Sequence, residues 1–336
     1  MDKYPISASS LEKFYYVDDH QLERQYKEHL SCHLNWKDKE QGAHTDTWSV
    51  FPQNIGPRMS IDETSLSDGE LYTVVSNKDA KGKRGALAAI VLGTKSEDVI
   101  SALKNIGQSI RETVTEITLD LSSSMRKMAH RAFPKAVQVT DRFHVQKLAM
   151  EALREMRISF RWDAINEENK QMAENKAARK RCEDVDEYEP EVFENGDTRK
   201  QLLARSRYLL FKSRNKWTES QKKRAKILFE LYPDIENAYN LTDELRRIYS
   251  STKIKGVAYT KLAHWYRHME DAGYDSFQVV KQTIHENYMD ILNFFDNRST
   301  NASAESFNAK IKNFRTQLRG ISDVKYFLFR LQKIYA

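Results

Sequence analysis

The segment VTEITLDLSSSMRKMAHRAFPKAVQVTDRF (114–143) decides the fold class. Its two ends, residues 114–121 and 136–143, are rich in apolar and β-branched residues and each predicts a buried strand. Between them, apolar residues recur at helical spacing from Met125 to Phe133, after a run of serines that can cap a helix. A strand, a helix and a second strand of this combined length form a right-handed parallel crossover. We therefore expect two parallel strands in the sheet.

Three more strand-like runs precede this segment, at residues 59–66, 71–78 and 85–93. The first two are separated by Ser67-Asp68-Gly69-Glu70, where Asp-Gly favours a hairpin turn. A helical pattern follows at residues 96–106. The order is therefore βββαβαβ, which predicts an α/β fold with a mixed five-stranded sheet.

The rest of the chain is mostly helical. From His144 to about residue 296 the pattern is helical, apart from an acidic stretch at 183–197 that we interpret as a solvated loop. A last long helix begins near Ser303, and a shorter one covers about 324–334. Residues 1–57 predict one helix, at about 20–36, and a connector. We divide the chain into an N-terminal helix and connector (1–57), the first part of a sheet domain (58–145), an all-helical insertion (146–296) and C-terminal helices that complete the sheet domain (297–336).

Composition excludes several classes of protein. The 336 residues carry a formal net charge of +6, which is compatible with a polyanionic partner. Two cysteines are too few for a disulfide scaffold or a four-cysteine zinc module, and the spacing of His29, Cys32, His33 and His44 fits no standard zinc site. The N-terminus has no signal-peptide pattern, and no apolar window is long enough to span a membrane. We expect a cytoplasmic protein with no membrane contact.

Two aspartates lie inside apolar strand patterns. Asp62 is in the first predicted strand and Asp120 ends the fourth, and burying an ionised carboxylate is costly unless something compensates it. If these strands are neighbours, the two acids meet at one edge of the sheet and need a cation. Oxygen ligands without cysteine or histidine suit Mg²⁺ or Mn²⁺. The alternative is that each aspartate is a turn or capping residue at the end of a strand.

A third acid, Glu305, lies in the last long helix. At 100° per residue, the apolar side chains of this helix share one face: Phe307, Ile311, Phe314 and Leu318. The opposite face carries Glu305, Asn308, Lys312 and Arg319. This polar face either returns an acid, an amide and bases to the sheet or is an ordinary solvated surface.

Basic residues are dense between 199 and 226, and three aromatic residues, Tyr208, Phe211 and Trp217, are interspersed. Lysine and arginine neutralise phosphates, and aromatic rings stack on unpaired bases, so the segment is a candidate DNA contact. A solvated helix pair is the alternative, and the acidic stretch at 183–197 could screen the segment. The candidates are Arg199, Lys200, Arg205, Arg207, Lys212, Arg214, Lys216, Lys222, Lys223, Arg224 and Lys226.

Four short motifs together resemble one family. IDE (61–63), LDLSSSM (119–125), VTDRFHVQK (139–147) and TNASAESFNAKIK (300–312) are similar to motifs of the DDE transposases of bacterial insertion sequences, of the ISL-three (ISL3) type. The resemblance covers about 58–336. It implies a ribonuclease H-like fold with strand order 3-2-1-4-5 and a large all-helical insertion before the last catalytic helix.

The resemblance also implies roles for individual residues. Asp62, Asp120 and Glu305 would be the catalytic triad and would bind two Mg²⁺ or Mn²⁺ ions. Asp141 and His144 match a D-x-x-H motif and, with Asn308 and Lys312, form a second tier of candidates that would orient groups near the scissile phosphate. The implied reaction is metal-dependent cleavage of DNA at transposon ends, followed by transfer of the 3′-OH to target DNA, with no covalent protein intermediate.

The implied partners are DNA and further copies of the chain on DNA. Family members usually carry an N-terminal zinc and helix-turn-helix region, which this sequence does not show. Recognition of the transposon ends would then come from a separate protein, from the insertion, or not occur at all. Two other functions stay open at this point: a ribonuclease H-like nuclease or resolvase, and an inactive or repurposed DNA-binding remnant of a transposase.

Overall fold

A computed structural model describes residues 1–336 except 39–43, 45–46, 67–68, 182–187 and 319–322. Two compact units make up the chain. Unit 1 contains Met1–Asp141 and Met289–Ala336, and unit 2 contains Arg142–Tyr288. The prediction places the boundaries slightly later, after residues 145 and 296.

Unit 1 is built on a mixed six-stranded sheet with the order β1-β4-β3-β2-β5-β6. The strands are β1 (Trp48–Val50), β2 (Arg58–Ser65), β3 (Leu71–Asn77), β4 (Leu87–Leu92), β5 (Glu116–Leu119) and β6 (Val137–Thr140). The pairs β1–β4, β4–β3 and β3–β2 are antiparallel, whereas β2–β5 and β5–β6 are parallel. The α/β class and the two parallel strands are thus as predicted.

The expectation of five strands is wrong by one. Residues 41–57 were expected to be a connector, but Trp48–Val50 pairs with β4 at the edge of the sheet. A three-residue strand carries too few residues for an alternating pattern, and its pairing depends on residues about 40 positions away. The expected hairpin between β2 and β3 is bracketed by a hydrogen bond from the Leu66 amide to the Glu70 carbonyl, at 2.7 Å, although Ser67 and Asp68 lie outside the described residues.

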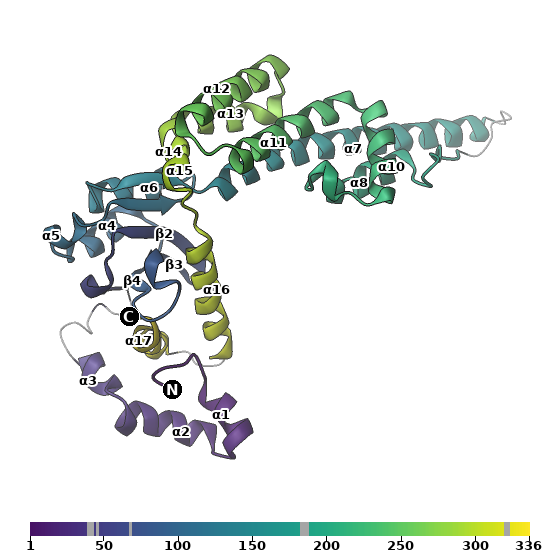
Figure 1. The fold of residues 1–336 in the computed structure, drawn as a ribbon. Coiled ribbons are helices and arrows are strands. Elements are labelled where there is room, and N and C mark those ends of the chain that lie inside the picture. Colours follow the sequence, from purple (N-terminus) through teal and green to yellow (C-terminus); the bar gives the residue numbers. More distant parts are fainter. Residues whose placement is uncertain (39–43, 45–46, 67–68, 182–187, 319–322) are drawn as a thin grey trace. The chain divides into compact units, whose positions relative to one another are not determined.

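The two faces of the sheet are covered by different helices. One face packs on α4 (Ser96–Lys104) and α6 (Ser123–Ala132), through a core that includes Met59, Ile61, Ile117 and Leu119. The other packs on α16 (Ala302–Gln317) and α17 (Val324–Tyr335), and Figure 1 shows α16 running alongside the sheet. The predicted apolar stripe of α16 is buried there: Phe307, Ile311, Phe314 and Leu318. Arg319, which was assigned to the other face of this helix, lies outside the described residues.

The remaining elements of unit 1 are short. They are α1 (Ala8–Tyr15), α2 (Asp19–Gln25), the π-helical turn Tyr26–Leu30, α3 (His33–Asp38), the 3₁₀ turns Pro52–Asn54 and Lys78–Ala80, α5 (Gln108–Arg111) and α15 (Phe294–Asn297), while α14 (Tyr288–Leu292) begins at the boundary. The single helix expected at 20–36 is therefore several pieces. The start of the chain is also anchored, because the buried Arg330 donates hydrogen bonds to the carbonyls of Met1 and Ile6, at 2.9 and 3.0 Å.

The described elements of unit 2 are all helices, which matches the helical pattern expected from His144 to about residue 296. Its elements are α7 (Arg142–Lys180), α8 (Arg199–Arg205), α9 (Arg207–Leu210), the 3₁₀ turn Arg214–Lys216, α10 (Glu219–Leu231), α11 (Pro233–Ser251), α12 (Lys255–Ala272), the 3₁₀ turn Asp275–Phe277 and α13 (Gln278–Glu286). Thr218 and Gln221 form a capping box at the start of α10. Pro233 is the first residue of α11, where the missing N–H costs nothing.

One acid of the stretch 183–197 is not solvated, which corrects the loop interpretation. The Asp197 side chain is fully buried and accepts hydrogen bonds from Arg205 and Arg224. The many acidic residues of this stretch predicted that all of it is exposed to solvent. At Asp197, however, two guanidinium groups offset the cost of burying the carboxylate. Residues 182–187 of the stretch lie outside the described residues.

We expect Phe314→Ala to destabilise unit 1 by about 3–5 kcal/mol, because Phe314 is fully buried between the sheet and α17. Hydrogen exchange of the β2–β5 amides measures this local free energy without interference from unit 2. Asn313→Ala, on the exposed side of the same helix, is the matched control and should change stability by less than about 0.5 kcal/mol. Equal effects of the two changes would contradict the packing of α16.

The buried Asp197 carboxylate should make the stability of unit 2 depend on pH in the acid range. Burial raises the pKa of this carboxyl, but the hydrogen bonds and charges of Arg224 and Arg205 outweigh burial and hold it below its usual range. The contribution of Asp197 to stability is therefore full above about pH 4 and is lost as the pH falls through the lowered pKa. We expect Asp197→Asn to cost roughly 3 kcal/mol at pH 7 and to flatten the acid limb of unfolding. An unchanged acid limb would show that the ion pairs contribute nothing.

Candidate active site

Three neighbouring parallel strands, β2, β5 and β6, bring three aspartates together at one edge of the sheet, level with the carboxyl ends of β5 and β6. In the β2–β5 pair, Ser60 is opposite Thr118, so Asp62 and Asp120 come level two residues further along. The last pair of β5 and β6 is followed by Asp120 and Asp141, which are level in the same way. Paired residues of parallel neighbours point to the same face, and ligands of such sheets bind beyond the carboxyl ends of the strands.

Helix α16 meets this edge with a polar face. Asn301, Glu305 and Asn308 follow each other at four and three residues, so they share one side of the helix. The Nδ2 atom of Asn308 donates to Asp62 Oδ2 at 2.6 Å, and Nδ2 of Asn301 lies 3.5 Å from Asp120 Oδ1. Glu305 is therefore on the helix face between the two asparagines that contact the strand aspartates.

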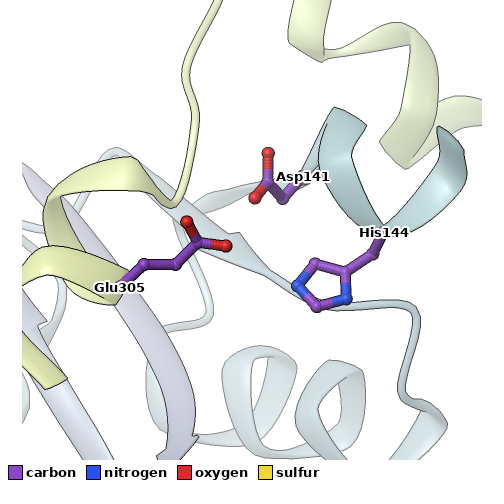
Figure 2. A group of neighbouring side chains, drawn as sticks. All are labelled: Asp141, His144 and Glu305. Carbon is purple, nitrogen blue, oxygen red and sulfur yellow. The ribbon is translucent and has the colours of Figure 1, made fainter. Parts of the chain in front are cut away.

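A group of three potential metal ligands lies at the same place (Figure 2). One ligand atom each from Asp141, His144 and Glu305 lie within 4.8 Å of one another. Asp141 is buried, His144 is half-buried and Glu305 is exposed. His144 follows Asp141 by three residues, in the first turn of α7, so its position beside Asp141 is fixed by the local chain.

The structure thus places the predicted site residues as follows. Asp62 and Asp120 lie level on adjacent strands, and the helix that carries Glu305 is bonded to both of them. The second-tier residues Asp141 and His144 lie next to Glu305. Asn308 was assigned to a polar face that could be solvated, but it is buried against Asp62. Lys312 is exposed, one turn beyond Asn308. The catalytic roles of these residues remain predictions.

Negative charge is concentrated at this edge. Glu63, the neighbour of Asp62 in β2, has its pKa raised first by burial and then by the charge of Asp120. The Glu63 amide donates to Asp62 Oδ1 at 2.8 Å, which holds one oxygen of that carboxylate. A carboxylate whose negative charge raises the pKa of a neighbouring acid favours a bound cation.

A buried polar network that the sequence did not reveal fixes the start of α16. Lys78 donates to Thr118 Oγ1 at 2.7 Å and lies 3.5 Å from a carboxylate oxygen of Glu116. Ser299, in the loop before α16, bonds to both Lys78 and Glu116. Burial lowers the pKa of Lys78, and the charge of Glu116 opposes that shift. The network ties the loop to β5 and thereby positions Glu305.

The sequence offered a signal for one of these residues, Asn301, but none for Lys78. Asn301 was within the quoted motif TNASAESFNAKIK, four residues before Glu305, so its place on the Glu305 side of the helix could have been found. Lys78 carried no such signal, because it directly follows β3 and has the sequence context of an ordinary loop lysine.

In unit 2 the basic segment divides into two groups. Six of its eleven predicted DNA contacts form ion pairs with acids of the same unit: Arg199, Lys200, Arg205, Arg214, Lys222 and Arg224. Among the described ion pairs, none includes the other five, which are Arg207, Lys212, Lys216, Lys223 and Lys226. Arg214 also lies over the Trp217 ring, which helps to explain the aromatic residues of the segment as packing.

Comparison with known proteins identifies the family. A family model described as a transposase, the ISL3 type of DDE transposase, matches residues 59–331. The chain belongs to this family. It is also 21% identical over 280 residues to a transposase for insertion sequence element IS1001 from Bordetella parapertussis, an alignment that covers 82% of this chain and 60% of that protein. No solved structure matches the chain.

Among the described residues, no helix is both long and apolar enough to cross a bilayer.

We expect Lys78→Met to destabilise unit 1 by about 3–5 kcal/mol, since it leaves the buried Glu116 carboxylate without its cation. Adding Glu116→Leu should recover much of that loss, because the double change removes both charges. Arg58→Met is the control, because its ion pair with Asp79 is largely exposed and should contribute less than about 1 kcal/mol. Urea unfolding of the wild type, Lys78→Met, Glu116→Leu, the double variant and Arg58→Met measures these differences, and an additive double mutant would contradict the coupling.

Proposed function

We propose that this chain is a transposase catalytic subunit that cleaves DNA at transposon ends and transfers the resulting 3′-OH to target DNA. The observation that carries the proposal is the level placement of Asp62 and Asp120, with the Glu305 helix bonded to both aspartates. The membership of the DDE transposase family supports a DNA-cleaving function for such a group of acids.

The sheet supports a ribonuclease H-like catalytic core. From β2 onward, the strands in chain order occupy the positions 3-2-1-4-5 across the sheet, and β1 is added beside β4. Three antiparallel strands followed by two parallel ones leave the first two acids of the proposal, Asp62 and Asp120, at adjacent strands. Residues 142–288 would be the helical insertion, and α16 would be the last catalytic helix.

The residues fit a divalent cation. Asp62, Asp120 and Glu305 offer carboxylate oxygens, the ligands that Mg²⁺ and Mn²⁺ prefer. Asn308 adds a buried amide oxygen, Oδ1, that has no hydrogen-bond partner among the described residues. When bound, such cations supply positive charge and Lewis acidity at a scissile phosphate.

The chain's own residues then have distinct tasks. Asn308 and the Glu63 amide hold the Asp62 carboxylate by its two oxygens, and Asn301 contacts that of Asp120. This pre-organisation keeps the acids in place before DNA arrives. Asp141 and His144 lie beside Glu305, where they can orient the phosphate or the attacking water. Lys312, exposed on the same helix, is placed to contact a DNA strand.

The proposed partners are DNA and further copies of the chain on DNA, and the proposed location is the bacterial cytoplasm. The chain spans about 60% of the length of its IS1001 relative, so recognition of the transposon ends can depend on further protein. A separate zinc and helix-turn-helix protein is our candidate for that task.

The test of the proposed function is Glu305→Gln. We expect nicking of a plasmid that carries the DNA flanking this gene to fall by at least about 100-fold with Mg²⁺ or Mn²⁺, because an amide is a poor replacement for a carboxylate ligand. DNA affinity should stay unchanged. Folding should be preserved, since Glu305 is exposed and opposite the buried stripe of α16.

The matched control is Glu112→Gln, an acid of unit 1 that pairs with Lys135 away from the proposed site. It should leave nicking unchanged. Wild-type nicking by Glu305→Gln in both metals would overturn the assignment of this residue. A wild-type protein with no metal-dependent nicking on any DNA, with or without its end-recognition partner, would overturn the proposed function.

A further measurement separates the triad from its neighbours. Binding of Mn²⁺ to the apoprotein, followed by electron paramagnetic resonance, should be lost or weakened at least about tenfold in Asp62→Asn and Asp120→Asn. His144→Ala should retain Mn²⁺ binding but lower the nicking rate, since we give this residue an orienting role. Loss of Mn²⁺ binding in His144→Ala alone, with Asp62→Asn unaffected, would assign the metal to Asp141, His144 and Glu305 instead.

A further inference from the structure

Unit 2 contains an arginine cluster that lies mostly outside the predicted basic segment. Arg154, Arg157 and Arg161 are spaced three and four residues apart on α7, so they form one stripe along the helix. Arg207 comes from α9 and joins them. We call these four residues the arginine cluster. Only Arg207 was among the residues that the sequence had suggested for DNA binding.

Arg157 is the fixed centre of the cluster. It is only 6% exposed, and its Nη1 atom donates to the Leu203 carbonyl at 2.6 Å. Leu203 lies in the last turn of α8, where carbonyls lack partners within the helix, so Arg157 caps this helix end. One edge of the guanidinium is thus held by the fold. A guanidinium has five donors in a plane, which leaves others for a ligand.

The charges around Arg157 are unfavourable in the isolated protein. Burial lowers the pKa of Arg157, and the positive charges of Arg161, Arg207 and Arg154 lower it further. In the part of the chain that the structure describes, no ion pair joins any of the four arginines to a carboxylate. This contrasts with the nearby Asp197, whose buried charge is neutralised by two arginines.

Three of the four arginines line a small cavity of about 10 Å³. Arg154, Arg157 and Arg207 line it together with the apolar side chains of Leu153, Leu210 and Phe211. Arg154, Arg161 and Arg207 are exposed, so an incoming group can reach them from solvent. The apolar side chains that line the cavity lower the local dielectric constant and thereby strengthen the attraction between these cations and an anion.

We propose that the arginine cluster is a binding site for backbone phosphates of duplex DNA. Guanidinium groups bind phosphate oxygens through two parallel hydrogen bonds. The negative charge of a backbone phosphate would also relieve the repulsion among the four cations. Three arginines along two turns of α7 match a row of phosphates better than a single small anion. This inference rests on the proposed function only for the identity of the nucleic acid as DNA.

The experiment uses the full-length protein in EDTA, so that no cleavage is involved. Fluorescence anisotropy measures its affinity for an unrelated DNA duplex across about 0.05–0.3 M salt. The test variant carries Arg154→Gln, Arg161→Gln and Arg207→Gln, all at exposed positions, and leaves the helix cap at Arg157 intact. The control variant carries Lys147→Gln, Lys170→Gln and Lys281→Gln, which remove the same charge from unit 2 side chains that are paired with carboxylates and lie outside the candidate DNA contacts.

We expect the test variant to bind DNA at least about tenfold more weakly and to lower the slope of log K against log salt by about two to three, since each phosphate contact contributes roughly 0.9 to that slope. The control variant should change affinity by less than about threefold. Equal losses in both variants would overturn the site in favour of diffuse charge attraction, and so would no loss in either. A loss confined to duplex RNA would overturn the assignment to DNA.

Two more measurements complete the test. Circular dichroism of the test variant should match the wild type, and Arg157→Lys should weaken DNA binding while it retains a charge that can still cap α8. Failure of the proposed function would appear as absent metal-dependent nicking, whereas failure of this inference would appear as unchanged anisotropy in EDTA. Either result is therefore independent of the other.

Discussion

The parallel register between β2 and β5 is the constraint on which the candidate active site depends. Because side chains alternate between the faces of a sheet, a slip of one residue would move Asp62 or Asp120 to the opposite face. That face is filled by the core of Met59, Ile61, Ile117 and Leu119, which excludes a carboxylate. The apolar residues of the two strands thus enforce the alignment of the acids between them.

Helix α16 is held to the same edge by two kinds of contact. Its apolar stripe packs on the sheet, and its asparagines bond to the strand aspartates. The buried pair of Lys78 and Glu116 anchors the loop that precedes it. Packing sets the axis of the helix, whereas the polar contacts set its position along that axis, and both are needed to bring Glu305 to the edge.

Much of this arrangement could be predicted from the sequence, for physical reasons. Strands β2 to β6 and the stripe of α16 have strong local periodicity, so the α/β class and the elements that carry Asp62, Asp120 and Glu305 were accessible. The edge strand at Trp48–Val50 was missed because its partner is distant in sequence and it is short. The burial of Asn308 and Asp197 was missed because polarity indicates solvent unless the partner is known. Arg154, Arg157 and Arg161 are spread over eight positions of a mixed helix, and only the fold adds Arg207 to them.

On the proposed function, the long interruption between Asp120 and Glu305 also determines when activity can begin. In the growing polypeptide, Glu305 is added 185 residues after Asp120, and all of unit 2 is translated between them. At about 5–20 residues per second, the ribosome needs roughly 10–40 s to cover that distance. During this interval the sheet edge holds its aspartates without α16. On the proposed function, a prematurely terminated product that lacks the last helix would be unable to cut the host chromosome.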